Sequence, residues 1–261
     1  MPSTSKPDPE AIRSVAAELN QLSDVLVITG AGMSAESGLP TYRGVGGLYQ
    51  DKKTDDGISI ETALSGSIFR NDPNITWKYL HQIEQACRGA HYNRGHKVLA
   101  EMEGRFERFW ILTQNIDGFH HAAGSRNVIE IHGNLYRLIC TGCKRKRTVD
   151  NYADLEIPPR CTVCQQMIRP EVVLFDEALP EAELTTLYSE LRRSFDAVIT
   201  IGTSSHFPYI AQPVIQAHQT GNLTIEINPT QTHVSEMIDI KLTSSAAVTL
   251  EQIWDLMKET A

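Results

Sequence analysis

The stretch VLVITGAGMSA, residues 25–35, joins a short β-branched apolar run to a glycine-rich turn. The run over 25–29 is typical of a strand buried on both faces. The turn fits the pattern G-x-G-x-x-A, with small residues at positions 30, 32 and 35. Small residues directly after a strand let the backbone approach a pyrophosphate at the start of the next helix. A tight strand-to-helix turn needs similar glycines, so the motif indicates a nucleotide site only when other features agree.

Further apolar runs extend this pattern along the chain. They span residues 109–113, 128–131, 197–201 and 223–227. Helical patterns separate several of these runs, and another precedes the first strand, with Ile12, Val15, Ala16 and Leu19 on one face. Apolar strands that alternate with helices predict an α/β fold with a parallel sheet.

Two stretches interrupt the alternation. Residues 44–106 carry several helical patterns and no convincing strand, and residues 136–167 hold four of the five cysteines. We expect both stretches to be insertions between strands of the sheet, which together form a second, smaller lobe.

The four cysteines form two Cys-x-x-Cys pairs, Cys140 with Cys143 and Cys161 with Cys164. Two such knuckles complete a tetrahedron of thiolates with no open position, which is typical of a structural zinc ion. Two disulfides are the alternative, and the absence of an apolar secretory segment near the N-terminus disfavours them. Cys87 lies alone on a predicted helix, where we expect a small buried hydrophobic side chain.

Charge and composition exclude several classes of protein. The chain has 24 basic and 32 acidic residues and a net charge of −8, which disfavours a dedicated nucleic-acid binder but suits a basic peptide substrate. No apolar stretch reaches the roughly 18 residues of a membrane span. The polar N-terminus lacks the features of a secretory signal, so we expect a cytoplasmic protein without a membrane segment.

Polar residues follow two of the predicted strands at the point where each ends. Gln114, Asn115 and Asp117 follow the run over 109–113, and His132 follows the next run. The carboxyl ends of parallel strands meet at one edge of a sheet, so we expect these side chains to converge there. His132 can act as a general base near neutral pH, although a lone histidine is more often structural. Asn115 and Asp117 can bind an amide or a ribose.

A second glycine turn, with the sequence GTS at residues 202–204, follows the run over 197–201. It either donates hydrogen bonds to a ligand at the sheet edge or is an ordinary turn that caps a helix. Asn228 lies at the end of the last apolar run and is a candidate for binding the adenosine ribose.

Together these motifs resemble the sirtuin family. The resemblance covers about residues 11–258, with the motifs in the family's order. They are GAGMS at 30–34, SGLPTYR at 37–43, TQNID at 113–117, HG at 132–133, the cysteine pairs, PEVVLF at 170–175, GTS at 202–204 and IN at 227–228. Several independent motifs in the right order are far more specific than any one of them.

The resemblance implies a fold and an activity. The fold is a Rossmann-type domain of residues 1–43, 107–135 and 168–261, with a small lobe made of a helical part, 44–106, and a zinc ribbon, 136–167. The activity is NAD-dependent deacylation of protein lysines, with NAD consumed as a co-substrate and nicotinamide and O-acyl-ADP-ribose released. The chain has almost no extension beyond this core, as in compact bacterial members, and a monomer is plausible.

The resemblance also assigns roles to individual residues. His132 would be the base that activates a ribose hydroxyl, and Asn115 would share the catalytic site. Residues 35–48 would form a loop that orders on cofactor binding. The cofactor would contact Gly30, Ala31, Gly32, Ser34, Ala35, Tyr42, Arg43, Gln114, Asn115, Ile116, Asp117, Gly202, Thr203, Ser204, Asn228 and Ala246. The acyl-lysine peptide would contact Val173, Phe175, Asp176, Glu177 and His206.

The sequence departs from the family where the acyl group is selected. Thr41 stands where many members have aspartate, and threonine at that position hints at the desuccinylase branch. Members of that branch also carry a Tyr-x-x-Arg pair, and these two positions are Leu80 and Ile83 here. A carboxylate buried against two aliphatic side chains would lack a partner. We therefore expect weak desuccinylase activity and a preference for uncharged acyl groups, including long apolar ones.

Three alternatives remain open. A Rossmann protein that binds NAD without deacylation would need the glycine turns but not the polar cluster. A scaffold whose zinc lobe grips a partner would need neither. A dehydrogenase would carry an acidic residue at a strand end about 20 positions after the first glycine turn, whereas Asp51, Asp55 and Asp56 lie in a polar stretch without strand character.

Overall fold

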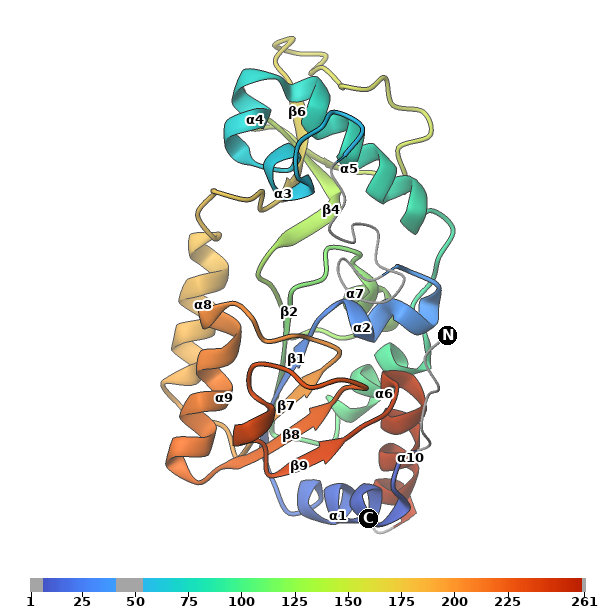
Figure 1. The fold of residues 1–261 in the computed structure, drawn as a ribbon, viewed down its shortest axis with the longest axis vertical. Coiled ribbons are helices and arrows are strands. Elements are labelled where there is room, and N and C mark those ends of the chain that lie inside the picture. Colours follow the sequence, from blue (N-terminus) through green and yellow to red (C-terminus); the bar gives the residue numbers. More distant parts are fainter. Residues whose placement is uncertain (1–6, 41–53, 260–261) are drawn as a thin grey trace.

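The computed structural model describes residues 7–40 and 54–259. These residues form two lobes arranged along the long axis of the molecule (Figure 1). The large lobe is built on a parallel six-stranded sheet, and the small lobe combines short helices with a three-stranded antiparallel sheet.

The large sheet has the strand order β3-β2-β1-β7-β8-β9, and all neighbouring strands are parallel. Its strands are β1 (Asp24–Thr29), β2 (Arg108–Thr113), β3 (Val128–Glu130), β7 (Ala197–Ile201), β8 (Leu223–Ile227) and β9 (Ile240–Leu242). The five apolar runs of the sequence thus form five of these strands. The chain builds outward from β1 in one direction and then returns to build outward in the other. The order therefore reverses between β1 and β7, where ligands bind in open α/β sheets.

Alternate residues of each strand face two different helical layers. Val25 and Val27 pack in the same core as α1 (Pro9–Leu19), α6 (Arg94–Met102) and α10 (Ala246–Glu259). Leu26 and Ile28 pack in a second core with α8 (Glu181–Leu191) and α9 (Pro208–Thr220). This alternation is the period of two of an extended chain, and it explains why the strands are apolar on both faces.

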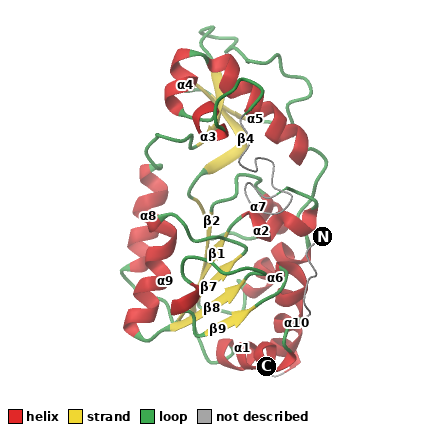
Figure 2. Cartoon of the chain, in the orientation of Figure 1, coloured by secondary structure: helices red, strands yellow, loops and turns green. Residues whose placement is uncertain are grey.

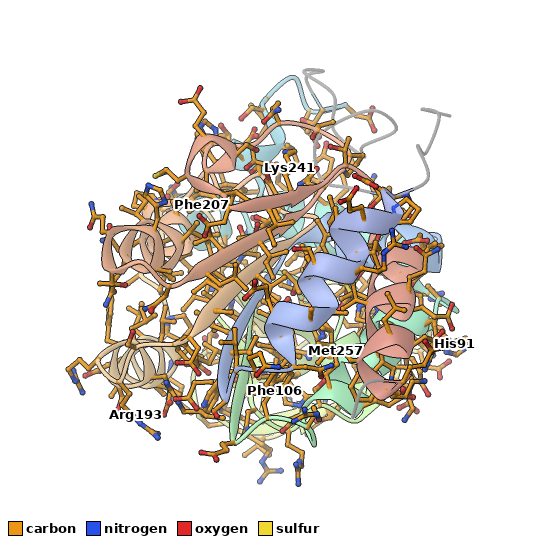
Figure 3. The ribbon with its side chains drawn as sticks, turned by 90° about the horizontal axis from the view of Figure 1, so that it is seen from below. His91, Phe106, Arg193, Phe207, Lys241 and Met257 are labelled. Atoms are coloured by element: carbon orange, nitrogen blue, oxygen red, sulfur yellow. The ribbon has the colours of Figure 1, made fainter. Side chains whose placement is uncertain are left out.

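The first of these layers is best seen from below (Figure 3). Helices α1 and α10 lie side by side across the sheet, and the labelled Phe106 and Met257 belong to the core beneath them. Helix α6 packs against α10, and its buried residues Val98, Leu99 and Met102 join this large core. The sequence-based division assigned α6 to the small lobe, because its pattern shows one apolar face without showing which core that face meets.

The small lobe contains α3 (Ile60–Ala63), α4 (Gly66–Asn71) and α5 (Pro73–Cys87), with β4 (Gly133–Cys140), β5 (Lys146–Thr148) and β6 (Ile168–Val172). Its sheet has the order β5-β4-β6, and much of the chain after β4 is loop (Figure 2). Trp77 is fully buried in its core and donates a hydrogen bond from Nε1 to the carbonyl of Ile168. Leu135, Val172 and Leu174 also pack in this core, although their segments were expected in the large domain.

The chain crosses between the lobes immediately after β3. Gly133 opens β4 with a φ of +79°, and a Cβ there would lie 1.8 Å from the carbonyl oxygen of Glu171. Only glycine fits such a contact. The carbonyl of His132 accepts a hydrogen bond from the N–H of Val173 at 2.9 Å. His132 is therefore fixed where the two lobes meet.

Candidate active site and metal centre

The glycine turns after β1 and β7 cross each other at the point where the strand order reverses. The N–H of Gly32 donates to the carbonyl of Gly202 at 2.9 Å. A Cβ on Gly32 would lie 2.6 Å from the Cα of Gly202, and a Cβ on Gly30 would lie 2.8 Å from the Gly202 carbonyl oxygen. The crossing alone therefore requires these glycines, whatever ligand binds above them.

Helix α2 (Ala31–Ser34) begins at this crossing. Its cap residue, Gly30, makes no side-chain hydrogen bond to the first turn. The first-turn N–H groups are thus left to backbone acceptors or to a ligand, and they favour an anion such as a phosphate.

Ser34, Asn115 and Asp117 converge in a hydrogen-bonded cluster at the end of α2, in which Ser34 and Asp117 are buried and Asn115 is partly buried. The hydroxyl of Ser34 donates to Oδ2 of Asp117 at 2.7 Å and accepts from Nδ2 of Asn115 at 3.1 Å. Asn115 Nδ2 also donates to the carbonyl of Gly30 at 3.0 Å, which ties the cluster to the first glycine turn. The structure thus brings Ser34, which follows β1, together with Asn115 and Asp117, which both follow β2. Ile116 lies between them in the chain and packs against the core of the small lobe.

Burial governs the electrostatics of Asp117. Loss of hydration raises its pKa, while the N–H of Phe119 and the hydroxyl of Ser34 oppose that effect. A carboxylate in such a recess interacts strongly with any donor that enters, because few waters compete.

Two buried histidines underlie the cluster. His96 accepts from the N–H of Asn93 at Nδ1, so its Nε2 carries the proton toward Ser34 Oγ, 3.4 Å away. His120 contacts the hydroxyl of Thr29 through Nε2 at 2.9 Å. Burial lowers the pKa of His96 to about 4 and that of His120 well below its usual value, so both rings are neutral at pH 7. Nothing in the sequence pattern predicts this neutral pair, because the two histidines come from different helices, α6 and α7 (Phe119–Ala123).

His132 is held in a single tautomer by its neighbours. Nδ1 lies 3.0 Å from the carbonyl oxygen of Gln114, which can only accept, so Nδ1 carries the proton. Nε2 therefore has a free lone pair, and the hydroxyl of Tyr209 donates to it at 2.7 Å. Burial lowers the pKa of His132, and the Gln114 carbonyl partly offsets this. A neutral histidine with a proton-free Nε2 is prepared to accept a proton. No motif in the sequence points to Tyr209 as a partner of His132.

The second glycine turn is stabilised by Thr203 within it and by Gln114 and Asn228 from neighbouring strand ends. Thr203 Oγ1 accepts from Nε2 of Gln114 at 2.7 Å and from the N–H of Ser205 at 3.1 Å. Asn228 donates from Nδ2 to the carbonyl of Thr203, and its Oδ1 accepts from Thr230. Thr203 and Asn228 thus hold the shape of the turn. Ser204 is exposed at its tip, where a ligand can reach it.

Ala246 is buried at the start of α10, a helix that contacts α2. Glu36, in the short 3₁₀ helix η1 (Ala35–Ser37), accepts from the N–H of Ala247 at 2.6 Å and from the hydroxyl of Ser245 at 3.2 Å. This carboxylate satisfies a free donor at the helix start and stabilises the helix dipole. Tyr42 and Arg43 lie outside the described residues.

The residues expected to bind peptide lie along the small lobe and at the second turn. The N–H of Phe175 donates to Leu64 and its carbonyl accepts from Gly66, so its backbone groups already have partners. Glu177 forms a bidentate pair with Arg169 at 2.6 and 2.8 Å. Asp176 accepts from the N–H of Ser67, near the start of α4.

The remaining candidates for substrate binding differ in exposure. His206 is exposed and contacts His233 through ring nitrogens 3.1 Å apart. Leu80 is 2% exposed and lies inside the core of the small lobe, while Ile83 is partly buried against it. Glu84, the next residue, is fully buried and pairs with Arg88 at 3.1 and 2.5 Å.

The four cysteines converge as their spacing predicts. Their sulfurs all lie within 4.8 Å of one another, with Cys140 to Cys164 at 3.3 Å and Cys143 to Cys161 at 3.7 Å. A tetrahedral zinc with bonds of about 2.3 Å needs sulfurs about 3.8 Å apart. Each knuckle ends in a left-handed residue, Lys144 or Gln165. The set therefore fits one zinc ion and leaves no ligand position open.

No helix among the described residues has both the length and the apolar character needed to cross a lipid bilayer.

Comparison with known proteins agrees with this geometry. Residues 30–208 match the model of the Sir2 family. A Pseudomonas aeruginosa protein named NAD-dependent protein deacylase 2 is 47% identical over 245 residues, which cover 93% of this chain and 95% of that protein. Among solved structures, a Sir2 homologue in complex with ADP-ribose superposes with a TM-score of 0.84 at 31% identity, covering 97% of each chain. A Sir2 structure with a deacetylated p53 peptide and 3′-O-acetyl-ADP-ribose gives a TM-score of 0.81 at 26% identity, covering 94% of this chain and 97% of that one.

Proposed function

This chain belongs to the Sir2 family, and from that premise we propose that it is an NAD-dependent protein lysine deacylase. The observation that carries the proposal is His132, a partly buried base with a proton-free Nε2 at the junction of the lobes. A protein that only bound NAD would have no need of such a base beside the cluster of Ser34, Asn115 and Asp117. The two glycine turns and this cluster together fit a dinucleotide co-substrate.

NAD supplies the ribose carbon to which the acyl oxygen becomes attached as nicotinamide leaves. The residues of this chain orient the groups and move one proton. His132 Nε2 accepts the proton of a ribose hydroxyl, and the resulting imidazolium is stabilised through Nδ1 by the carbonyl of Gln114. The buried carboxylate of Asp117 and the amide of Asn115 orient the nicotinamide and its ribose.

Zinc has a structural role in this proposal. The closed set of four thiolates offers no position to water or substrate, so the ion cannot take part in the reaction. Cys140 ends β4, and Cys140 and Cys161 pack in the core of the small lobe. The ion would join the loop after β4 to that core.

The substrate class is an acylated lysine in a protein, with a preference for uncharged acyl groups. Leu80 and Ile83 offer no positive charge to a succinyl carboxylate. The nearby Arg88 does not replace the missing arginine, because the buried carboxylate of Glu84 already holds it. A second carboxylate here would meet both repulsion from Glu84 and loss of hydration.

A mass-spectrometric assay with NAD tests the proposal. One peptide sequence carrying acetyl-, succinyl- or myristoyl-lysine is incubated in parallel, with His132→Ala as the control. Loss of the acyl mass with an equal amount of nicotinamide, absent in the variant, supports a deacylase. NAD binding without turnover of any peptide would favour the non-catalytic alternative, and reduction of NAD would indicate a dehydrogenase.

A further inference from the structure

Tyr209 makes a contact that the proposed reaction does not use. It is the second residue of α9, directly after Pro208, and its hydroxyl lies 2.7 Å from Nε2 of His132. Nε2 is the atom that takes the proton in the proposed reaction. Burial raises the pKa of Tyr209 to about 12, so the phenol keeps its proton and acts as the donor.

The position of the Tyr209 ring is fixed by its surroundings. Phe207 stacks on it with ring centroids 5.4 Å apart and an angle of 11° between the planes. The same Phe207 meets His132 edge-on, at 5.9 Å and 85°. The next residue, Ile210, is fully buried in the core under α9. The packing of these neighbours thus holds the Tyr209 hydroxyl in place against His132, which is the arrangement expected of a positioning group.

We propose that Tyr209 is a positioning residue for His132, which holds Nε2 proton-free in the resting enzyme and yields that nitrogen to the ribose hydroxyl during catalysis. The inference rests on the proposed role of His132 as the base. Two hydrogen bonds, one at each ring nitrogen, then fix both the tautomer and the plane of the imidazole. A competing Nε2–H tautomer would leave Nδ1 without a proton against the Gln114 carbonyl oxygen, which can only accept.

A measurable consequence follows for the protonation of His132. A hydrogen bond donated to Nε2 exists only with the neutral ring, so it favours the neutral form and lowers the pKa. The groups that face the ring are the Tyr209 phenol from α9, the Phe207 ring before α9 and the Gln114 carbonyl after β2. Of these, only Tyr209 can titrate, and it remains protonated over the range in which histidine titrates.

The test compares the wild type with Tyr209→Phe, which removes one oxygen and keeps the ring stack. Tyr188→Phe, at an exposed tyrosine on α8, is the matched control. Imidazole ¹⁵N NMR of the ligand-free protein follows the His132 signals, which are identified by their loss in His132→Asn. We expect Nε2 of Tyr209→Phe to shift toward the value of a free unprotonated nitrogen. Loss of a hydrogen bond of ordinary strength should also raise the His132 pKa by about 0.5 to 1 unit.

Kinetics provide the second readout. The acid limb of kcat/KM reports the free enzyme, so it should move to higher pH by the same amount in Tyr209→Phe and stay in place in Tyr188→Phe. An unchanged Nε2 signal and pKa would overturn the inference, and so would a changed pKa with an unmoved acid limb. A wild type that deacylates nothing would refute the proposed function instead, and the NMR result would still report on the contact.

Discussion

Replacement of Gly133 by alanine should damage the junction that holds His132. A methyl group at this position would lie 1.8 Å from the carbonyl oxygen of Glu171, about half a normal van der Waals contact distance, and the φ of +79° is unfavourable for any side chain. The backbone of β4 or β6 must therefore move by more than an ångström. That movement breaks the pairing of Gly133 with Val172 and strains the bond from Val173 to the His132 carbonyl.

The stability lost in Gly133→Ala has a backbone part and a steric part. A second glycine with positive φ but open surroundings measures the backbone part alone. Gly221 ends α9 with a φ of +72°, and a Cβ there meets nothing within 4 Å. Gly221→Ala should therefore lose only the backbone preference, about 1 to 2 kcal/mol. Gly133→Ala loses this amount together with one or two backbone hydrogen bonds of about 1 kcal/mol each and the residual strain. We expect a total of about 3 to 5 kcal/mol.

Urea unfolding of the two variants and the wild type, followed by circular dichroism, measures these differences. Deacylation by Gly133→Ala should also fall by at least about tenfold under conditions where the variant is folded, because a shift of His132 by 1 Å disrupts the geometry of proton transfer. Gly221→Ala should keep the wild-type rate. If the two variants lose the same stability within about 1 kcal/mol, the steric argument for Gly133 is wrong.

The remaining predictions concern the base, the metal and the acyl group. His132→Ala should remove deacylation without loss of the folded state, and turnover that survives would exclude His132 as the base. Burial lowers the pKa of His132, so wild-type activity should persist down to pH 6.5 and fall only below it as the ring gains a proton; a pH–rate profile that falls above 6.5 would contradict this. Cys140→Ser should lose zinc, measured by elemental analysis, and destabilise the small lobe. Cys87→Ser, at a cysteine outside the sulfur cluster, should retain the metal, and a stable zinc-free Cys140→Ser protein would refute the structural role. Leu80→Tyr combined with Ile83→Arg should raise the ratio of desuccinylation to deacetylation, although Leu80 is a core residue and stability should fall; an unchanged ratio in folded protein would disprove the assignment of the acyl pocket.

The sequence predicts the central strands of the large sheet well, because they are apolar on both faces. The short edge strand β9 lacks this apolar pattern and is not predicted. It has three residues, and Lys241 at its centre is paired with the buried Glu226 at 2.6 Å. In the sequence alone, a lysine at this position is typical of a loop. Only the ion pair with Glu226 on the neighbouring strand explains why it can lie in the sheet.

The small lobe is predicted less well for a related reason. Its cysteine spacing identifies the metal site, since ligand geometry constrains local sequence. Its sheet is different, because β5 is an exposed run from Lys146 to Thr148 and β6 pairs with β4 across the intervening ribbon. β5 therefore has no buried face, and the alternating burial of β6 does not show which strand it pairs with. The packing of α6 is likewise a property of distant partners on α10.

The residues of the candidate site also differ in whether the sequence predicts them. Residues at strand ends, such as Asn115 and His132, can be predicted because topology brings strand ends together. The neutral histidines beneath Ser34 and the phenol above His132 depend on side chains from other segments. Their positions are decided by packing, which one sequence does not display.

The crossing of the two glycine turns also affects the order in which the protein can mature. Gly32 and Gly202 are separated by most of the chain, yet each provides the surface against which the other is shaped. During synthesis, the first glycine turn therefore cannot adopt its final conformation until β7 and the second glycine turn have been made. A fragment that ends before residue 197 would lack this partner and should fail to capture NAD, even with its own glycines intact. In the complete chain, a dinucleotide that binds only the closed crossing joins both halves of the sheet and stabilises them as one unit.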